Sequence, residues 1–155
     1  MTGLIDSRLR ELQISLPEPA KAAANYVPYV VSANLVHIAG QVPVGPDGLQ
    51  FQGKVGADFS LEEGMEAARL CGLNIIAQAR AAAGGNLDRV RRIVKLGGFV
   101  NCPPEFDQHP AVINGASDLM VDVFGDKGRH ARFAVGAPSL PFNVAVEIDA
   151  IVELV

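Results

Sequence analysis

The chain has 155 residues, of which 49% are hydrophobic, and this suits one compact domain whose core needs neither a disulfide nor a metal. Thirteen Lys and Arg residues against seventeen Asp and Glu residues give a formal net charge of −4. The totals therefore lack the excess of cations that a nucleic-acid-binding protein uses to neutralise phosphates, although they leave a local basic patch open. We expect no nucleic-acid partner.

The cysteines and histidines do not form a recognisable metal or redox motif. Cys71 and Cys102 lie in apolar stretches without CxxC spacing, which favours two structural core thiols. His37, His109 and His130 form no HxxxH or HxH ligand set, so no metal site is predicted. The N-terminus carries charges where a signal peptide would be apolar, and no apolar run reaches about twenty residues. We therefore expect a cytoplasmic protein with no membrane partner.

The order of helical and strand patterns predicts an α+β protein. In chain order we expect a helix at 4–13, paired strands at 26–32 and 34–44, a helix at 60–83, a strand at 91–101, a helix at 110–124, and strands at 129–137 and 143–154. Ser60 and Glu63 form a capping-box pattern, and Pro110 fits the first turn of a helix. Two long helices over one face of a single mixed β-sheet form a two-layer sandwich. Residues 1–23 are expected to be an N-terminal helix and linker extension, and residues 24–155 the domain itself.

The last two predicted strands each contain a charged residue that is a candidate for a functional site. In the final strand Val146 and Ile148 alternate with Glu147, which places Glu147 on the face that the helices leave uncovered. The same alternation in the preceding strand predicts Arg132 on that uncovered face, and a hairpin between the two strands would bring Arg132 opposite Glu147. Such a pair has two interpretations. It is either a cross-strand ion pair that stabilises the fold by about 0.2–1 kcal/mol, or a site in which the arginine binds a ligand carboxylate and the glutamate accepts and donates protons.

Three sequence blocks resemble one known family. They are PYVVSANLVHIAGQVPV at 28–44, GGNLDRVRRIVKLGGFVNCPPEFDQHPAVIN at 84–114 and ARFAVGAPSLPFNVAVEIDAIVEL at 131–154. The chain is similar to the Rid proteins, also called the RidA or YjgF family, which are small imine and enamine deaminases, and in particular to the longer subgroup of roughly 150 residues. The resemblance implies a chorismate-mutase-like fold, a homotrimer with pockets in the clefts between subunits, and no metal or organic cofactor.

The resemblance also implies roles for individual residues. Arg132 matches the arginine that binds the substrate carboxylate, and Glu147 matches the glutamate that positions the hydrolytic water. Tyr29 matches a pocket tyrosine, Gly40 the glycine of a Gly-Gln-[Ile/Val]-Pro turn, and Asn114 an asparagine that opens the second long helix. Arg132, Glu147 and Tyr29 are therefore the expected catalytic residues, and Gly40, Asn114 and Ala134 are expected to contribute to substrate binding.

Three positions differ from the usual pattern of the family. Ala39 replaces a common serine, Ala134 a common cysteine in the substrate pocket, and His130 a common proline.

The expected function is hydrolytic deamination of a 2-imino or enamino acid to a 2-oxo acid and ammonia. One alternative is a trimer that binds a small carboxylate metabolite without turning it over. Another is an endoribonuclease or translation inhibitor, against which the acidic balance argues.

Overall fold

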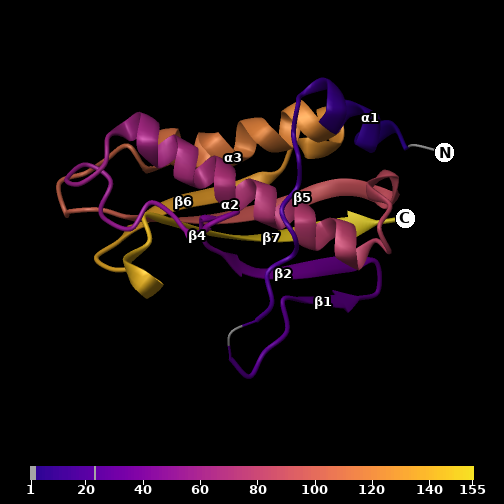
Figure 1. Cartoon of the computed structure of the whole chain (residues 1–155), viewed down its shortest axis with the longest axis horizontal. Coiled ribbons are helices and arrows are strands. Elements are labelled where there is room, and N and C mark those ends of the chain that lie inside the picture. Colours follow the sequence, from indigo (N-terminus) through magenta and orange to yellow (C-terminus); the bar gives the residue numbers. More distant parts are fainter. Residues whose placement is uncertain (1–2, 23) are drawn as a thin grey trace.

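A five-stranded sheet with two long helices on one face forms the body of the protein (Figure 1). The computed structural model describes residues 3–22 and 24–155. The strands of the main sheet are β1 (Tyr29–Ser32), β2 (Leu35–Gln41), β5 (Val90–Asn101), β6 (Ala131–Ala137) and β7 (Val146–Leu154), and a small separate hairpin consists of β3 (Val44–Gly45) and β4 (Gly48–Leu49). The helices are α1 (Leu4–Glu11), α2 (Leu61–Ala82) and α3 (His109–Phe124), and the 3₁₀ turns are η1 (Leu87–Arg89), η2 (Gly125–Gly128) and η3 (Pro141–Asn143).

The predicted α+β fold and the order of its main elements are confirmed. Helix α2 begins with the predicted capping box, in which the Ser60 hydroxyl accepts the Glu63 amide at 3.2 Å and the Glu63 carboxylate accepts the Ser60 amide at 3.1 Å. Pro110 occupies the first turn of α3, where its missing N–H costs no hydrogen bond. Helix α2 lies over β7 and β2, and α3 lies over β5 and β6.

The pairing of the last two strands differs from the prediction. The sheet order is β1-β2-β7-β5-β6, so β7 lies between β2 and β5, while β6 forms an edge and runs parallel to β5. The predicted β6–β7 hairpin is therefore wrong. Helix α3 connects β5 to β6, and a strand–helix–strand unit of this kind makes its two strands parallel neighbours. The chain then turns through Phe142 and Asn143, both with φ of 57°, and enters β7 on the far side of β5.

The covered face of the sheet forms one core with the helices. The predicted inward residues of the last strand are all buried, and these are Val144, Val146, Ile148, Ala150, Val152 and Leu154. The opposite, uncovered face is called the open face below.

No helix in residues 3–22 and 24–155 is both long enough and apolar enough to cross a membrane.

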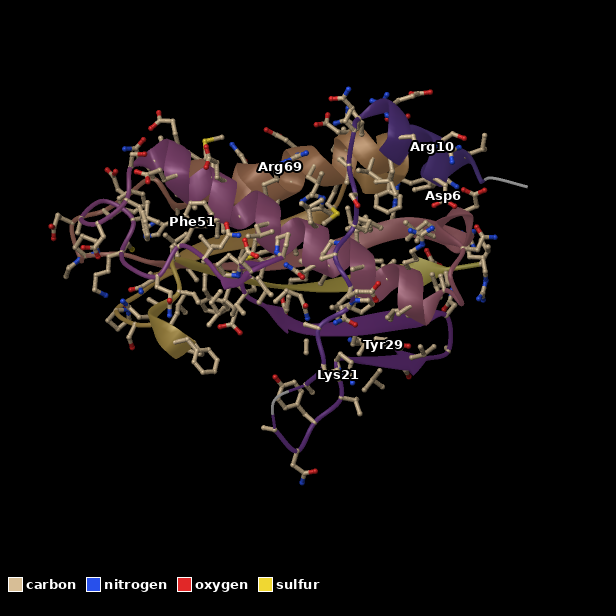
Figure 2. The ribbon with its side chains drawn as sticks, in the orientation of Figure 1. Asp6, Arg10, Lys21, Tyr29, Phe51 and Arg69 are labelled. Atoms are coloured by element: carbon tan, nitrogen blue, oxygen red, sulfur yellow. The ribbon has the colours of Figure 1, made fainter. Side chains whose placement is uncertain are left out.

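The N-terminal helix packs against the rest of the chain. Leu9 is buried in the common core, and the Asp88 carboxylate accepts the amides of Leu4 and Ile5 at 3.0 and 2.9 Å. Asp6 of α1, labelled in Figure 2, forms an ion pair of 2.9 Å with an arginine of α2. The boundary predicted after residue 23 falls on a residue outside the described part of the chain.

Candidate functional site

Glu147 is held above a bulge of the neighbouring strand. It lies half-buried on the open face, as predicted, and β2 has an irregular register between Ile38 and Gln41 at this point. The Glu147 side chain lies directly over Gly40, because a Cβ atom added to Gly40 would stand only 3.1 Å from the carboxyl carbon of Glu147. The glycine therefore leaves the space that the carboxylate occupies.

A hollow of about 300 Å³ surrounds this carboxylate. Besides Gly40 and Glu147, its walls include Ala39 of β2, Phe142 of the turn before β7, and residues 20–22 of the N-terminal linker. The pKa of Glu147 is raised above its ordinary value, first because burial disfavours the charged form and second because Asp149 lies nearby with a like charge. A carboxylate with a raised pKa is a better proton acceptor, which suits a group that handles water.

Arg132 lies on the other face of the sheet from the one predicted. Its partner in the parallel register is Leu96, which is fully buried under the helices, whereas Phe133 and Val135 are 37% and 42% exposed on the open face. The prediction that Arg132 shares the uncovered face with Glu147 is therefore wrong. The half-buried Arg132 side chain instead reaches the side of α3, where its Nη1 donates to Asn114 Oδ1 at 2.8 Å.

Ser117 and His130 extend this hydrogen-bonded group. Arg132 Nη1 also donates to Ser117 Oγ at 3.1 Å, and Ser117 Oγ lies 2.9 Å from His130 Nε2. His130 Nδ1 lies 2.6 Å from the carbonyl oxygen of Gly128. Because a carbonyl only accepts, Nδ1 carries the proton, and in the neutral ring Nε2 then accepts from the Ser117 hydroxyl. His130 is half-buried and has partners at both ring nitrogens.

The guanidinium of Arg132 forms no ion pair with any of the described residues of its own chain. Its partners Asn114 and Ser117 are both neutral. Across residues 3–22 and 24–155, no carboxylate oxygen lies within 4.0 Å of Arg132, so the cross-strand ion pair with Glu147 does not form. Strand β5 separates the strands of these two residues. A guanidinium held in place by neutral acceptors is a suitable binding group for a carboxylate from outside the chain.

The remaining predicted residues lie near one or the other of these two groups. Ala134 packs toward the core two residues after Arg132, on the α3 side of β6. Tyr29, labelled in Figure 2, is on the far edge strand β1, where it pairs with Ile38. It lines a separate surface hollow of about 590 Å³. That hollow shares Tyr26 and Ala39 with the hollow around the glutamate, so Tyr29 is close to that site without lining it.

The predicted site therefore falls into two halves within one chain. Asn114, Arg132 and Ala134 form the arginine half beside α3, and Gly40 and Glu147 form the glutamate half on the open face. Sequence analysis missed Ser117, although it lies one helical turn after Asn114 and so shares its face of α3. The fold and these halves define a small α+β sandwich protein with an arginine available to an anion and a separate half-buried glutamate.

Comparison with known proteins assigns the family. The family model described as "YjgF/chorismate mutase-like, putative endoribonuclease" matches residues 6–154, and the chain belongs to this YjgF/Rid family. Protein TCP17 of Trypanosoma cruzi is 49% identical over 154 residues, which cover 99% of this chain and 96% of that protein. Protein Atu1372 of Agrobacterium tumefaciens, of unknown function, has a crystal structure that matches with 49% identity and a TM-score of 0.91 over 97% of this chain and 92% of that one. Escherichia coli TdcF, solved with bound serine, matches with 28% identity and a TM-score of 0.59 over 89% of this chain and 94% of that one.

Proposed function

We propose that the protein is a hydrolytic deaminase of small 2-imino or enamino acids. The observation that carries this proposal is the state of Arg132, a half-buried cation with only neutral partners and with no carboxylate oxygen within 4.0 Å among residues 3–22 and 24–155. Membership of the YjgF/Rid family supports the same function. The bound serine of TdcF is a further support, because serine has the size and the carboxylate of the substrates proposed here.

The two halves of the site would meet between copies of the chain. Arg132 and Glu147 lie on different faces of the sheet, so a head-to-tail contact can bring the arginine half of one copy to the glutamate half of the next. Head-to-tail contacts of one kind close into rings, and the Rid resemblance implies a ring of three. The open face supports assembly because it exposes the apolar side chains of Val30, Phe99, Phe133 and Val135.

The proposed reaction requires two things of the protein, namely that it position the substrate and that one side chain transfer protons. Arg132 binds the carboxylate of the substrate and holds the adjacent imine carbon near Glu147 of the neighbouring copy. Glu147 takes a proton from a water molecule as its oxygen bonds to the imine carbon, and the proton then passes to the nitrogen. The hydroxyl proton of the resulting carbinolamine then passes to the nitrogen as the carbon–oxygen double bond forms and the carbon–nitrogen bond breaks, and the products are a 2-oxo acid and ammonia. Ala39 and Ala134 widen the two halves relative to the serine and cysteine common in the family.

A complementation experiment tests both the reaction and the shared site. An amino-acid oxidase generates 2-iminobutanoate, and release of 2-oxobutanoate is followed with and without the protein. We expect Arg132→Gln and Glu147→Gln to be inactive alone. When the two variants are co-expressed with different tags and purified together, each site draws its two residues from two chains, so random mixing restores about a quarter of wild-type activity.

The controls separate assembly from catalysis. Light scattering should give a mass about three times the 16.3 kDa chain for the wild type and both variants. Failure of the mixed protein to recover activity while both variants assemble would contradict a site shared between copies. Binding of 2-oxobutanoate by calorimetry without any acceleration of deamination would instead support the carboxylate-binding alternative and overturn the deaminase.

A further inference from the structure

Another pocket lies at the carboxyl end of β6, the opposite end of this strand from Arg132. It has a volume of about 470 Å³ and is lined by residues from the carboxyl end of β6, the loop between β5 and α3, the start of α3 and the segment before α2. Three of its lining side chains carry polar or charged groups, namely Lys54, Cys102 and His109. The apolar walls consist of Pro103, Pro104, Phe106, Ala137 and Pro138. No step of the proposed deamination uses this pocket.

The floor of the pocket is a thiol–imidazole pair that fits over a glycine. Cys102 Sγ lies 3.4 Å from His109 Nε2. A Cβ atom added to Gly136 would stand 2.6 Å from that nitrogen and 2.9 Å from that sulfur. The Phe106 ring meets the His109 ring edge to face, with centroids 5.4 Å apart. The imidazole is therefore fixed from two sides, and the glycine provides the space for both polar groups.

Lys54 adds a positive charge that the chain does not neutralise. Its ammonium donates to Asn101 Oδ1 at 2.7 Å and to the carbonyl oxygen of Pro138. Both acceptors are uncharged, and within the described residues no carboxylate oxygen lies within 4.0 Å of the ammonium. An ammonium has three N–H donors, so one stays available beside the pocket.

The thiol is suited to hydrogen bonding rather than to nucleophilic attack. The pKa of Cys102 is raised from its ordinary value because burial disfavours the thiolate, and Glu105 acts in the same direction. The charge of Lys54 and a backbone hydrogen bond from Ala137 oppose this shift without reversing it. Cys102 is therefore a neutral thiol at pH 7, which favours a ligand that binds without a covalent bond.

We propose that this pocket binds a small monocarboxylate with an apolar body, whose carboxylate pairs with Lys54 and whose body lies against Phe106 and the prolines. The volume lies within the usual range for small-molecule sites, and apolar walls with a few polar groups are typical of them. The site uses none of the residues of the proposed deaminase, so the two sites can be tested separately.

Calorimetry with cyclohexanecarboxylate, and with cyclohexanecarboxamide as a neutral molecule of the same shape, tests the proposal on the full-length protein. We expect binding of the carboxylate, a loss of at least about tenfold in affinity for the carboxamide, and a similar loss in Lys54→Met. Lys54→Arg should retain most of the affinity because it keeps the charge. Arg132→Gln should bind as the wild type does, whereas loss of binding in that variant would place the ligand at the deaminase site and overturn the proposal.

Alkylation by iodoacetamide in alkaline solution, which ionises part of the Cys102 thiol, locates the ligand, because Cys102 lines the pocket and the fully buried Cys71 is an internal control. With ligand at ten times its Kd, labelling of Cys102 should slow by roughly tenfold, and labelling of Cys71 should not change. Gly136→Ala fills the floor of the pocket and should abolish binding even if Lys54→Met disturbs the loops that the lysine joins. Equal affinity for carboxylate and carboxamide, or unchanged binding in Gly136→Ala, would overturn the proposal.

Discussion

Replacement of Gly40 by alanine should impair catalysis while leaving the fold intact. The backbone of Gly40 lies outside the left-handed region, so alanine can adopt its conformation. The new methyl group would stand 3.1 Å from the carboxyl carbon of Glu147, whereas carbon atoms normally pack at about 3.5–4.0 Å. The carboxylate must therefore move by about 0.5–1 Å, and a displacement of this size in a positioned catalytic group costs up to about a hundredfold in rate.

The assay measures kcat/KM for 2-iminobutanoate together with the free energy of unfolding in urea. Because the displaced atoms belong to the end of a flexible side chain, we expect stability to change by less than about 1 kcal/mol. Gly45→Ala is the matched control, since its methyl group would likewise displace only the end of a side chain, that of Gln50, in the β3–β4 hairpin. Wild-type kcat/KM in Gly40→Ala, with activity lost in Glu147→Gln, would refute the view that the position of this carboxylate matters.

Four further outcomes are expected. Ser60→Ala should lower the free energy of unfolding by about 1 kcal/mol in urea denaturation, because α2 loses its capping box. Leu9→Ala should destabilise by about 2–5 kcal/mol, whereas Leu4→Ala, at a position 82% exposed, should change stability by less than about 0.5 kcal/mol. Ser117→Ala should raise KM more than it lowers kcat, because Arg132 loses an acceptor that orients it. Folding raises the pKa of Glu147, so the protonated carboxyl stabilises the folded state. This contribution is fully present below the pKa of the unfolded chain and is lost as pH rises through the pKa of the folded state. Urea midpoints measured from pH 4 to 7 should therefore fall less in Glu147→Gln than in the wild type.

Local sequence signals predicted the elements but not all of their neighbours. The capping box at Ser60 and the alternation around Val146 each depend on residues close together in the chain, and both are confirmed. The position of Arg132 depended on which strands pair. Because Phe133 and Val135 are apolar and alternate with Arg132, the pattern predicts them for the covered face, yet both lie on the open face. Hydrophobic alternation shows that a strand has two different faces, but it does not show which face the helices cover. The helix between β5 and β6 was the better guide, because it makes these strands parallel.

Sequence patterns do not predict the contacts that loops bring about. His130 meets Ser117 because the turn after α3 folds back onto the helix, and Cys102 meets His109 because the loop before α3 does the same. In each pair only one residue belongs to a helix, so helical or strand spacing does not predict either contact. The family resemblance named Asn114 as a substrate-binding residue at the start of the second long helix. The structure places it in the second turn of α3, where it accepts a hydrogen bond from Arg132 that neither the resemblance nor the sequence predicted.

One wall of the glutamate hollow comes from outside the sheet. Residues 20–22 of the linker line it, and Gln78 of α2 donates to the carbonyl oxygen of Ala20 at 2.7 Å, which ties the linker in place. Lys21, labelled in Figure 2, gives this wall a positive charge. Insertions, deletions or charge changes in the linker would alter the size and polarity of the hollow while every strand kept its register. Relatives that share the reactive residues could therefore diverge in substrate through their N-terminal segments alone, and the same segment offers protein engineers a place to change selectivity.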